Sequence, residues 1–327
     1  MIQFQYVRPK TVKEAVSAQQ KDTNSKFIAG GTNQIDLMKR YVSNPEKLID
    51  INNLPLKFIE HNNGKLRIGA LALNGEVSDH PLVKEKLPLL SDALAAGASA
   101  QLRNMATVGG NMLQRTRCPY FYDTTLPCNK REPGSGCGAL EGFNRMHAIF
   151  GFSEKCIAVH PSDMSVALTA LEATVNVSGP KGDRTIPFTD FHRLPGDTPH
   201  IDTNLGYGEL ITGIEVADNP YNRNFSYLKV RDRASYAFAL VSVAAGLHIE
   251  GGRIKSARLA LGGVAHKPWR LKEVENWLAG KTVSEETFKQ AGVLAMQGSK
   301  GFQYNKFKLK LTPASIVEAL ITASGKV

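Results

Sequence analysis

The four cysteines of this 327-residue chain are gathered in one short stretch. Cys118, Cys128, Cys137 and Cys156 lie within 39 residues, with nine, eight and eighteen residues between successive members. A zinc site usually contains at least one close C-x2–4-C pair, and a bacterial ferredoxin contains a C-x2-C-x2-C run. Neither pattern occurs here, so the spacing alone leaves open an iron–sulfur cluster, a zinc site, or disulfides, for which four cysteines allow three pairings.

The sequence around the cysteines differs from the rest of the chain. Residues 112–157 are rich in Pro, Gly, Arg and aromatic residues and show no sustained period of 2 or 3.6. We therefore expect an irregular loop that something other than a hydrophobic core organises. Four thiolates can hold one [4Fe–4S] cluster. Basic side chains that could offset the charge of the thiolates flank them: Arg115, Arg117, Lys130 and Arg131.

Two histidines and three aromatic residues also lie near the cysteines. We interpret His147 and His160 as structural, because four cysteines already suffice for a cluster. The aromatic run of Tyr120, Phe121 and Tyr122 is expected to shield a redox site from water rather than to take part in the chemistry.

A second chemical signal is the turn after the apolar run at residues 27–29. Gly30 and Gly31 follow this run directly, and a helix-like stretch begins at Asn33. Glycines let a ligand approach the backbone, and free N–H groups at a helix start favour an anion such as phosphate. The turn lacks both the GxGxxG pattern and the Gly-Lys-Ser/Thr of a nucleoside triphosphate loop. A plain strand-to-helix turn would explain it about as often.

A similar turn occurs once more along the chain. The segment from Thr107 to Asn111 reads Thr-Val-Gly-Gly-Asn and again follows an apolar stretch. Two such turns could clamp the two halves of one long anionic ligand, with hydrogen bonds from Thr107 and Asn111. The pair of turns therefore indicates a dinucleotide ligand.

Hydrophobic periodicity and capping residues predict the elements that position these groups. Helices are expected at residues 11–20, 33–40, 87–98 and 271–280, and strands at 26–29, 47–51, 65–71 and 209–216. A further helix, capped by Ser162 or Asp163, has an apolar face at Met164, Ala167, Leu168 and Leu171. Gly251-Gly252 predicts a two-residue hairpin, and Thr312-Pro313 predicts the N-cap and first residue of a last helix.

The composition excludes some classes of function. The net charge is +10, but 40 Lys and Arg are interspersed with 30 Asp and Glu, and no basic helix, zinc finger or RNA-binding signature occurs. A basic surface facing an anionic cofactor or an acidic partner is favoured over nucleic-acid binding. The longest apolar stretch, residues 235–247, is too short to span a membrane, and the start lacks a secretory signal.

Five segments carry a resemblance to a known family. They are, in order, KFIAGGTN, RNMATVGGN, PSDMSVALTALEATV, GELITGIEV and YLKVRDRASYAFALVSVAA. Over nearly its whole length the chain resembles the FAD-binding subunits of molybdenum hydroxylases, the xanthine dehydrogenase and aldehyde oxidoreductase family. The resemblance implies an α+β protein with the two-subdomain FAD-binding fold of the vanillyl-alcohol oxidase type and a C-terminal α+β flavoprotein domain. The expected divisions are 1–55 and 56–220 for the FAD-binding subdomains, with the insertion at 112–157, and 221–327 for the C-terminal domain.

The resemblance also implies which residues bind FAD. The first turn would bind the FAD pyrophosphate, and the second would line the cofactor. Lys229 would contact the flavin edge, where a cation stabilises the anionic reduced flavin, and Ile211 would contact the ring through its backbone. The residues that match the family's motifs are Lys26, Phe27, Ile28, Ala29, Gly30, Gly31, Thr32, Asn33, Gln34, Thr107, Gly110, Asn111, Asp163, Ile211 and Lys229.

The insertion between Asn111 and Asp163 resembles that of one subgroup of this family. Most family members pass quickly from the GGN turn to the motif aspartate. The bacterial aldehyde oxidoreductase FAD subunits with an additional [4Fe–4S] cluster carry segments similar to QRTRCPYFYDT, PCNKREPGSGCGALEGFNRMHA and CIAVHPSD. This resemblance implies one [4Fe–4S] cluster, with Cys118, Cys128, Cys137 and Cys156 as its ligands. There are two alternatives. One is the flavoprotein subunit of 4-hydroxybenzoyl-CoA reductase, which carries a comparable insertion. The other is a structural iron–sulfur or zinc module without flavin.

The resemblance further implies a heterotrimer. A large subunit with the molybdenum cofactor would oxidise the aldehyde, and a small subunit would carry two [2Fe–2S] clusters. Electrons would reach FAD in this chain and leave to an external acceptor, so no residue here is expected to touch the aldehyde. Related enzymes are exported folded by a Tat signal on the small subunit. We therefore expect the periplasm, with the cytoplasm as the alternative.

Overall fold

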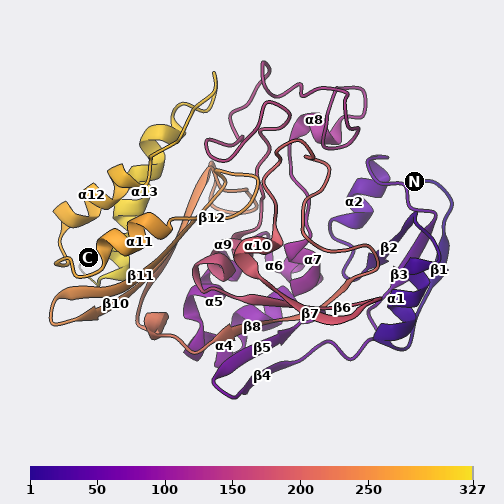
Figure 1. Ribbon diagram of the computed structural model, residues 1–327, viewed down its shortest axis with the longest axis horizontal. Helices are drawn as coiled ribbons and strands as arrows, with labels where there is room; N and C mark the ends of the chain where they lie inside the picture. The colour runs from indigo at the N-terminus through magenta and orange to yellow at the C-terminus, as the bar shows by residue number, and fades with distance from the viewer. Residues whose placement is uncertain (326–327) are drawn as a thin grey trace.

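The strands of the chain form three β-sheets that follow one another along the sequence. The computed structural model describes residues 1–325. Figure 1 shows the N-terminal unit, a central sheet with its helices, and a C-terminal sheet with its helices arranged along the long axis of the molecule. The mixture of helices and strands confirms the α+β class, whereas the domain divisions after residues 55 and 220 stay predictions.

The first sheet is small and parallel. Its strands are paired in the order β1 (Gln5–Val7), β3 (Lys47–Asp50) and β2 (Ser25–Ile28). Helix α1 (Val12–Gln20) connects β1 to β2 and begins as predicted, because the Thr11 hydroxyl accepts a hydrogen bond from the Glu14 N–H at 3.1 Å. Helix α2 (Gln34–Lys39) connects β2 to β3 and also begins after Asn33. The Asn33 side chain does not cap this helix, because its Oδ1 accepts a hydrogen bond from the N–H of Arg115 instead.

The central sheet is antiparallel and has one packed and one polar face. Its strands are ordered β4 (Ile59–Asn62), β5 (Lys65–Gly69), β8 (Leu210–Ala217), β6 (Thr174–Gly179) and β7 (Gly182–Pro187). Alternate residues of β5 and β8 enter the core, while Arg67 and Glu215 form an ion pair on the other face. The helices of this unit are α3 (Asn74–Asp79), α4 (Pro81–Lys86), α5 (Pro88–Ala96), α6 (Ala100–Arg103), α7 (Val108–Met112), α9 (Asp163–Ala170) and α10 (Phe188–Phe191).

Helix α9 lies at the centre of the molecule. Ser162 caps it by accepting a hydrogen bond from the Ser165 N–H at 3.0 Å, as one of the two predicted caps. All residues of α9 are buried, and not only the predicted apolar face, because the helix packs between α5 and the C-terminal sheet. This position carries Asp163, at the first residue of the helix, into the interior.

The C-terminal sheet is also antiparallel, in the order β12 (Trp269–Arg270), β11 (Arg253–Gly262), β10 (Val241–Glu250) and β9 (Asn224–Val230). Gly251 and Gly252 form the predicted hairpin, with φ values of +55° and +72°. A short 3-10 helix, η1 (Pro220–Asn222), precedes the sheet. Helices α11 (Lys272–Leu278), α12 (Glu285–Leu294) and α13 (Lys308–Ala323) follow it, and α11 and α13 pack on the sheet.

The predicted start of the last helix is wrong. Helix α13 begins at Lys308, so Thr312 and Pro313 lie inside it. A proline inside a helix loses one backbone hydrogen bond and is normally destabilising. The longer helix forms nevertheless, because Lys308, Thr312, Ile316 and Leu320, spaced four residues apart, are all fully buried on one face. Tertiary packing thus outweighs the local capping signal.

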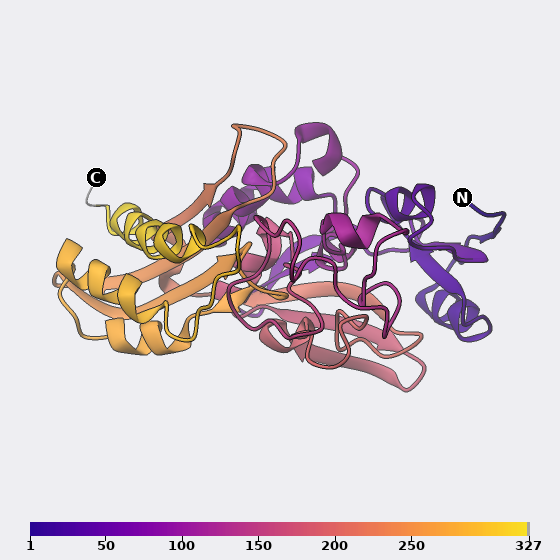
Figure 2. The same ribbon diagram turned by 90° about the horizontal axis from the view of Figure 1, so that it is seen from above.

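The cysteine-containing segment is irregular, as predicted. Between α7 and α9 the described chain forms one helical turn, α8 (Pro119–Tyr122), and otherwise loops. In Figure 1 this segment lies at the top of the view, between α2 and α13, and Figure 2 shows its loops near the middle of the long axis. The expectation that no hydrophobic core organises it is wrong at its end, because Ile149 and Phe150 join the core of the C-terminal sheet. Elsewhere side chains such as Arg131 hold it, donating to the carbonyls of Tyr120 and Phe121.

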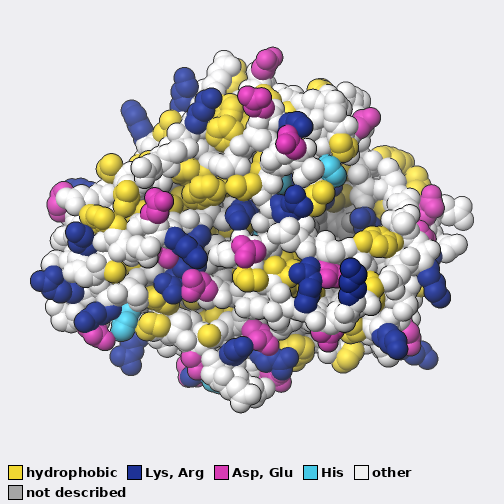
Figure 3. Space-filling model, viewed as in Figure 1, with side chains coloured by type: hydrophobic (Ala, Val, Ile, Leu, Met, Phe, Trp, Pro, Cys, Tyr) yellow, Lys and Arg dark blue, Asp and Glu magenta, His cyan; other side chains and the backbone are white. Residues whose placement is uncertain are grey.

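The surface agrees with the charge pattern of the sequence. Lys and Arg side chains are interspersed with Asp and Glu over the face drawn in Figure 3. Among residues 1–325, none of the helices combines the length and the apolar character that a membrane crossing requires.

Candidate cofactor site

The two glycine turns lie against each other, and their contact explains one missing side chain. A Cβ atom on Gly30 would lie 1.8 Å from the carbonyl oxygen of Met105, which precedes the second turn, so only glycine fits at this position. Gly31 has a φ of +72°, a conformation that other L-residues rarely adopt. The fold of the turns therefore requires both glycines, before any ligand is considered.

The first turn presents unpaired hydrogen-bond donors. In the described range of residues 1–325, the backbone N–H groups of residues 30–33 donate to no other residue, and Ile35 makes the first α2 bond, to the carbonyl of Gly31. Consecutive free N–H groups beside a helix start form a cradle for an anion. The turn thus fits a phosphate group, which is the role predicted for it.

The second turn differs from the first, because its donors are already used. Gly109 donates to the carbonyl of Ala70 at 2.8 Å, and Gly110 donates to the Thr107 hydroxyl at 3.2 Å. The turn is the start of the short helix α7, with Thr107 as its N-cap. The Asn111 Oδ1 accepts a hydrogen bond from Ser162, which caps α9. The second turn thus positions its neighbours, and the contacts of Thr107, Gly110 and Asn111 with FAD stay predictions.

Asp163 and Lys229, which are far apart in the sequence, form a buried ion pair. The Lys229 Nζ lies 2.8 Å from the Asp163 Oδ2, and the two side chains are only 4% and 9% exposed. The hydroxyl of Tyr227 donates to the other carboxylate oxygen at 2.7 Å. Burial, together with the Asp163 charge, raises the pKa of this hydroxyl well above its ordinary value. The structure therefore unites these two predicted site residues, and Asp163 offsets the charge of Lys229.

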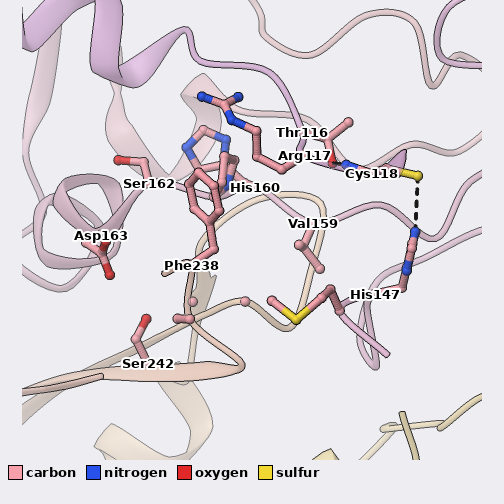
Figure 4. Close-up of a pocket in the computed structure, with 15 residues that line it drawn as sticks. Thr116, Arg117, Cys118, His147, Val159, His160, Ser162, Asp163, Phe238 and Ser242 are labelled. Atoms are coloured by element: carbon pink, nitrogen blue, oxygen red, sulfur yellow. Dashed lines mark hydrogen bonds between the residues drawn. The ribbon is translucent and has the colours of Figure 1, made fainter. Parts of the chain in front are cut away.

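A cavity opens beside Asp163. Figure 4 shows Asp163, Ser162 and Ser242 at one end of this cavity and Cys118 and His147 at the other, with Phe238 between them. The cavity thus connects Asp163, a predicted FAD-binding residue, to Cys118, a predicted cluster ligand.

All four cysteines line a second cavity. It lies next to the first, and Thr116 and Cys118 belong to the walls of both. The cysteines are free thiols. Burial raises the pKa of the Cys118 thiol to about 12 and that of Cys156 to about 11, and it also raises the pKa of Cys137. The thiols of Cys118 and Cys156 are therefore protonated at pH 7.

The cysteine side chains do not form a ready metal site within residues 1–325. A zinc ion requires all its sulfur ligands at about 2.3 Å from one point. Among residues 1–325, no three His, Cys, Asp or Glu side chains are grouped closely enough to hold one ion. A [4Fe–4S] cluster distributes its four thiolates over four different irons. The donor set of four cysteines around one cavity fits that arrangement in chemical type.

A buried polar network fixes the edge of the cysteine cavity. Lys130 lines this cavity and donates to the Pro199 carbonyl and to Asp202, and its Nζ lies 2.7 Å from the His266 Nε2. Arg115 also pairs with Asp202, at 2.7 Å. Burial alone would raise the pKa of Asp202, but Lys130 and Arg115 outweigh it and hold this pKa well below its usual range. The network ties the cysteine segment to the loop around residue 200.

The remaining predicted residues are distributed around these cavities. Phe121 and Tyr122 pack with Cys118 and Cys128 on α2, and Tyr120 lines the cysteine cavity. His147 contacts Cys118, whereas the His160 Nε2 lies 3.2 Å from the Ser165 Oγ. Ile211 is buried in β8, and neither it nor residues 26–34 line the two cavities.

Several site residues could not be found from the sequence. Phe238, Ser242 and Thr116 line the larger cavity, and Asp202 and His266 hold Lys130. None of these residues forms a local motif with the cysteines or the turns. Only the tertiary fold places them together.

Comparisons with known proteins agree with this description. The family model described as "FAD binding domain in molybdopterin dehydrogenase" matches residues 2–217, and the one described as "CO dehydrogenase flavoprotein C-terminal domain" matches residues 226–300. The chain is 50% identical over 327 residues to the aldehyde oxidoreductase FAD-binding subunit PaoB of Escherichia coli K12, covering 99% of each chain. It is 31% identical to the glyceraldehyde dehydrogenase medium chain of Sulfolobus acidocaldarius, covering 88% of this chain and 85% of that one.

A solved structure shares the whole architecture. The carbon monoxide dehydrogenase of Hydrogenophaga pseudoflava contains a chain that superposes with a TM-score of 0.78 at 26% identity, covering 100% of this chain and 99% of that one. The matching family models extend over both the FAD-binding region and the C-terminal sheet. The chain therefore belongs to the family of FAD-binding subunits of molybdenum hydroxylases, which are oxidoreductases.

Proposed function

We propose that this chain is the FAD- and [4Fe–4S]-containing electron-transfer subunit of a molybdenum-dependent aldehyde oxidoreductase. The observation that carries the proposal is the 50% identity, over the whole chain, to the E. coli aldehyde oxidoreductase FAD-binding subunit. In this role the chain receives electrons from aldehyde oxidation on a partner subunit and passes them to an external acceptor. It contributes no residue to the aldehyde site.

Residues 26–34 would hold the FAD pyrophosphate. The free N–H groups of residues 30–33 support this role, because they can donate to phosphate oxygens without breaking any hydrogen bond of the protein. FAD, when bound, supplies an acceptor for two electrons. Asp163 and Lys229 would position the flavin as a neutral pair and not as a lone cation, because each offsets the other's charge. Thr107, Gly110, Asn111 and Ile211 complete the proposed set.

Cys118, Cys128, Cys137 and Cys156 would hold one [4Fe–4S] cluster. Their convergence on one cavity, although eight to eighteen residues separate successive cysteines in the sequence, supports this role. Binding would require the thiols to lose their protons. Burial raises the pKa of Cys156, and the charge of Lys130 favours proton loss because it offsets part of that rise. The network of Lys130, Asp202 and Arg115 would keep this charge in place.

The proposed enzyme is a heterotrimer with a molybdenum-cofactor subunit and a small [2Fe–2S] subunit. Relatives named as medium chains of glyceraldehyde and carbon monoxide dehydrogenases support a role within a larger complex. We further propose that the folded complex reaches the periplasm through a Tat signal on the small subunit.

Co-expression of the three chains tests the proposal. Size-exclusion chromatography should give one complex that oxidises aldehydes, shows a flavin spectrum and contains iron and acid-labile sulfide in excess of the [2Fe–2S] subunit. The isolated chain should carry FAD but show no aldehyde oxidation. Full aldehyde activity of this chain alone would contradict the proposal, as would a complex that reduces an aromatic CoA thioester but oxidises no aldehyde.

A further inference from the structure

One contact of the cysteine segment has no role in the function described so far. The Nε2 atom of His147 lies 3.1 Å from the sulfur of Cys118 (Figure 4). The other ring nitrogen, Nδ1, is buried near the Asn144 carbonyl but forms no hydrogen bond of normal geometry in the described residues. A thiolate that binds iron carries no proton to donate. The contact therefore persists in the loaded protein as a hydrogen bond only if Nε2 carries the proton.

The protein holds His147 firmly from the other side. Asn305 donates to the carbonyls of His147 and Ala148, each at 3.1 Å. The ammonium of Lys308 donates to the His147 carbonyl at 3.0 Å and to that of Gly263 at 2.7 Å. Both Asn305 and Lys308 are fully buried. Two buried side chains thus fix the backbone of His147, which limits the positions that its ring can take.

We propose that His147 is a positioning residue that donates a hydrogen bond to the Cys118 thiolate and thereby raises the reduction potential of the cluster. The inference rests on the proposed [4Fe–4S] cluster. Reduction adds one electron, and part of the added negative charge resides on the thiolate sulfurs. An N–H donor stabilises this charge more in the reduced than in the oxidised state, and hydrogen bonds to the sulfurs are among the factors that set such potentials.

The position of Cys118 makes this hydrogen bond relevant to electron transfer. Cys118 is the cysteine that lines both cavities, and His147 lines the larger cavity beside it. The second histidine of the segment, His160, lies against Ser165 and not against a cysteine. The proposed tuning therefore depends on His147 alone among these two histidines.

Three substitutions of His147 in the co-expressed complex test the inference. His147→Leu removes the donor. His147→Gln places an amide N–H near the position of Nε2, and His147→Asn places one near Nδ1, so His147→Asn is the matched control. The readouts are iron and sulfide content and the midpoint potential of the cluster, from dithionite titration followed by electron paramagnetic resonance. We expect a more negative potential in the Leu and Asn variants, and a return toward the wild-type value in the Gln variant.

The outcomes separate this inference from the proposed function. A wild-type complex whose only iron belongs to the [2Fe–2S] subunit overturns the cluster, and the role of His147 with it. An iron-replete His147→Leu protein with the wild-type potential overturns the role alone. If the His147→Leu protein loses its cluster, the potentials of the His147→Gln and His147→Asn proteins test the role of His147 instead. Equal potentials in these two variants, or loss of the cluster from both, contradict a tuning hydrogen bond at Nε2.

Discussion

Replacing Gly30 by alanine should weaken FAD binding strongly, because it forces the two glycine turns apart. The new Cβ would lie 1.8 Å from the Met105 oxygen and 2.7 Å from its carbonyl carbon, whereas Cβ atoms essentially never approach within 3.0 Å of another heavy atom. Both contacts are backbone atoms, so no side chain can rotate away. One of the turns must therefore shift by about 1 Å.

The size of the effect follows from this shift. Overpacking of a tight site costs about 1–3 kcal/mol of folding free energy. A misplacement of about 1 Å in a preorganised site can cost about 10²-fold, which corresponds to about 2.7 kcal/mol. We therefore expect the Gly30→Ala protein to fold but to bind FAD about 100-fold more weakly. The assays are the flavin content of the purified protein, the FAD dissociation constant from flavin fluorescence, and urea unfolding of the apoprotein.

Matched glycine variants separate this contact from backbone strain. Gly31 and Gly252 share a φ of +72°, but a Cβ on Gly31 would meet Ile35 at 3.0 Å, whereas one on Gly252 would meet nothing within 4 Å. Alanine in this conformation costs roughly 1–2 kcal/mol. Gly252→Ala should lower stability by this amount and leave FAD binding unchanged, while Gly31→Val should also strip the flavin. A Gly30→Ala protein that retains full FAD affinity would refute the placement of the pyrophosphate at this turn.

Three further predictions concern the interior. Asp163→Asn leaves the Lys229 ammonium buried without its partner and should lower the unfolding free energy by about 3–5 kcal/mol in urea titrations. Adding Lys229→Met should restore part of this loss. If the losses of the two single variants simply add in the double variant, the pairing is contradicted. Cys137→Ser should reduce the iron and sulfide of the complex by about four of each per chain, with only partial loss of flavin, because residues 30–33 lie outside the segment; unchanged iron would contradict the cluster. Burial lowers the pKa of Lys308 to about 7, so the unfolded chain binds more protons above that pH, and stability due to this residue should rise from about pH 7 to about pH 10. Lys308→Met should flatten that rise, and identical pH profiles of the two proteins would show that Lys308 stays charged.

The sequence predicts those elements whose signals are local. The hydroxyl of Thr11, the cap at Ser162 and the Gly251-Gly252 hairpin act within a few residues of themselves, and all three are found. The prediction at Thr312-Pro313 fails for the opposite reason. The burial of Lys308 and Ile316 on one face is a property of the assembled core, which no local cap reveals.

The candidate site also contains some residues that a local pattern reveals and others that only the fold reveals. The cysteines and the first turn could be found because a ligand set and a glycine pair are visible as residue types. The pairing of Lys229 with Asp163, and the contact of His147 with Cys118, join residues 66 and 29 positions apart. Their spacing carries no period or motif, so the sequence does not show which residue each of them contacts.

The hydrogen bonds that Asn305 and Lys308 donate to the His147 carbonyl can form only late in synthesis. The carbonyl of His147 is bound by a side chain 161 positions later in the chain, so the ribosome releases the cysteine segment long before its partner exists. During synthesis, at about 5–20 residues per second, the His147 carbonyl therefore lacks these partners for several seconds. The residues that line the cysteine cavity all lie between Thr116 and Ala158. They can thus come together early, whereas the backbone of His147 becomes fixed only when Asn305 and the start of α13 dock against it.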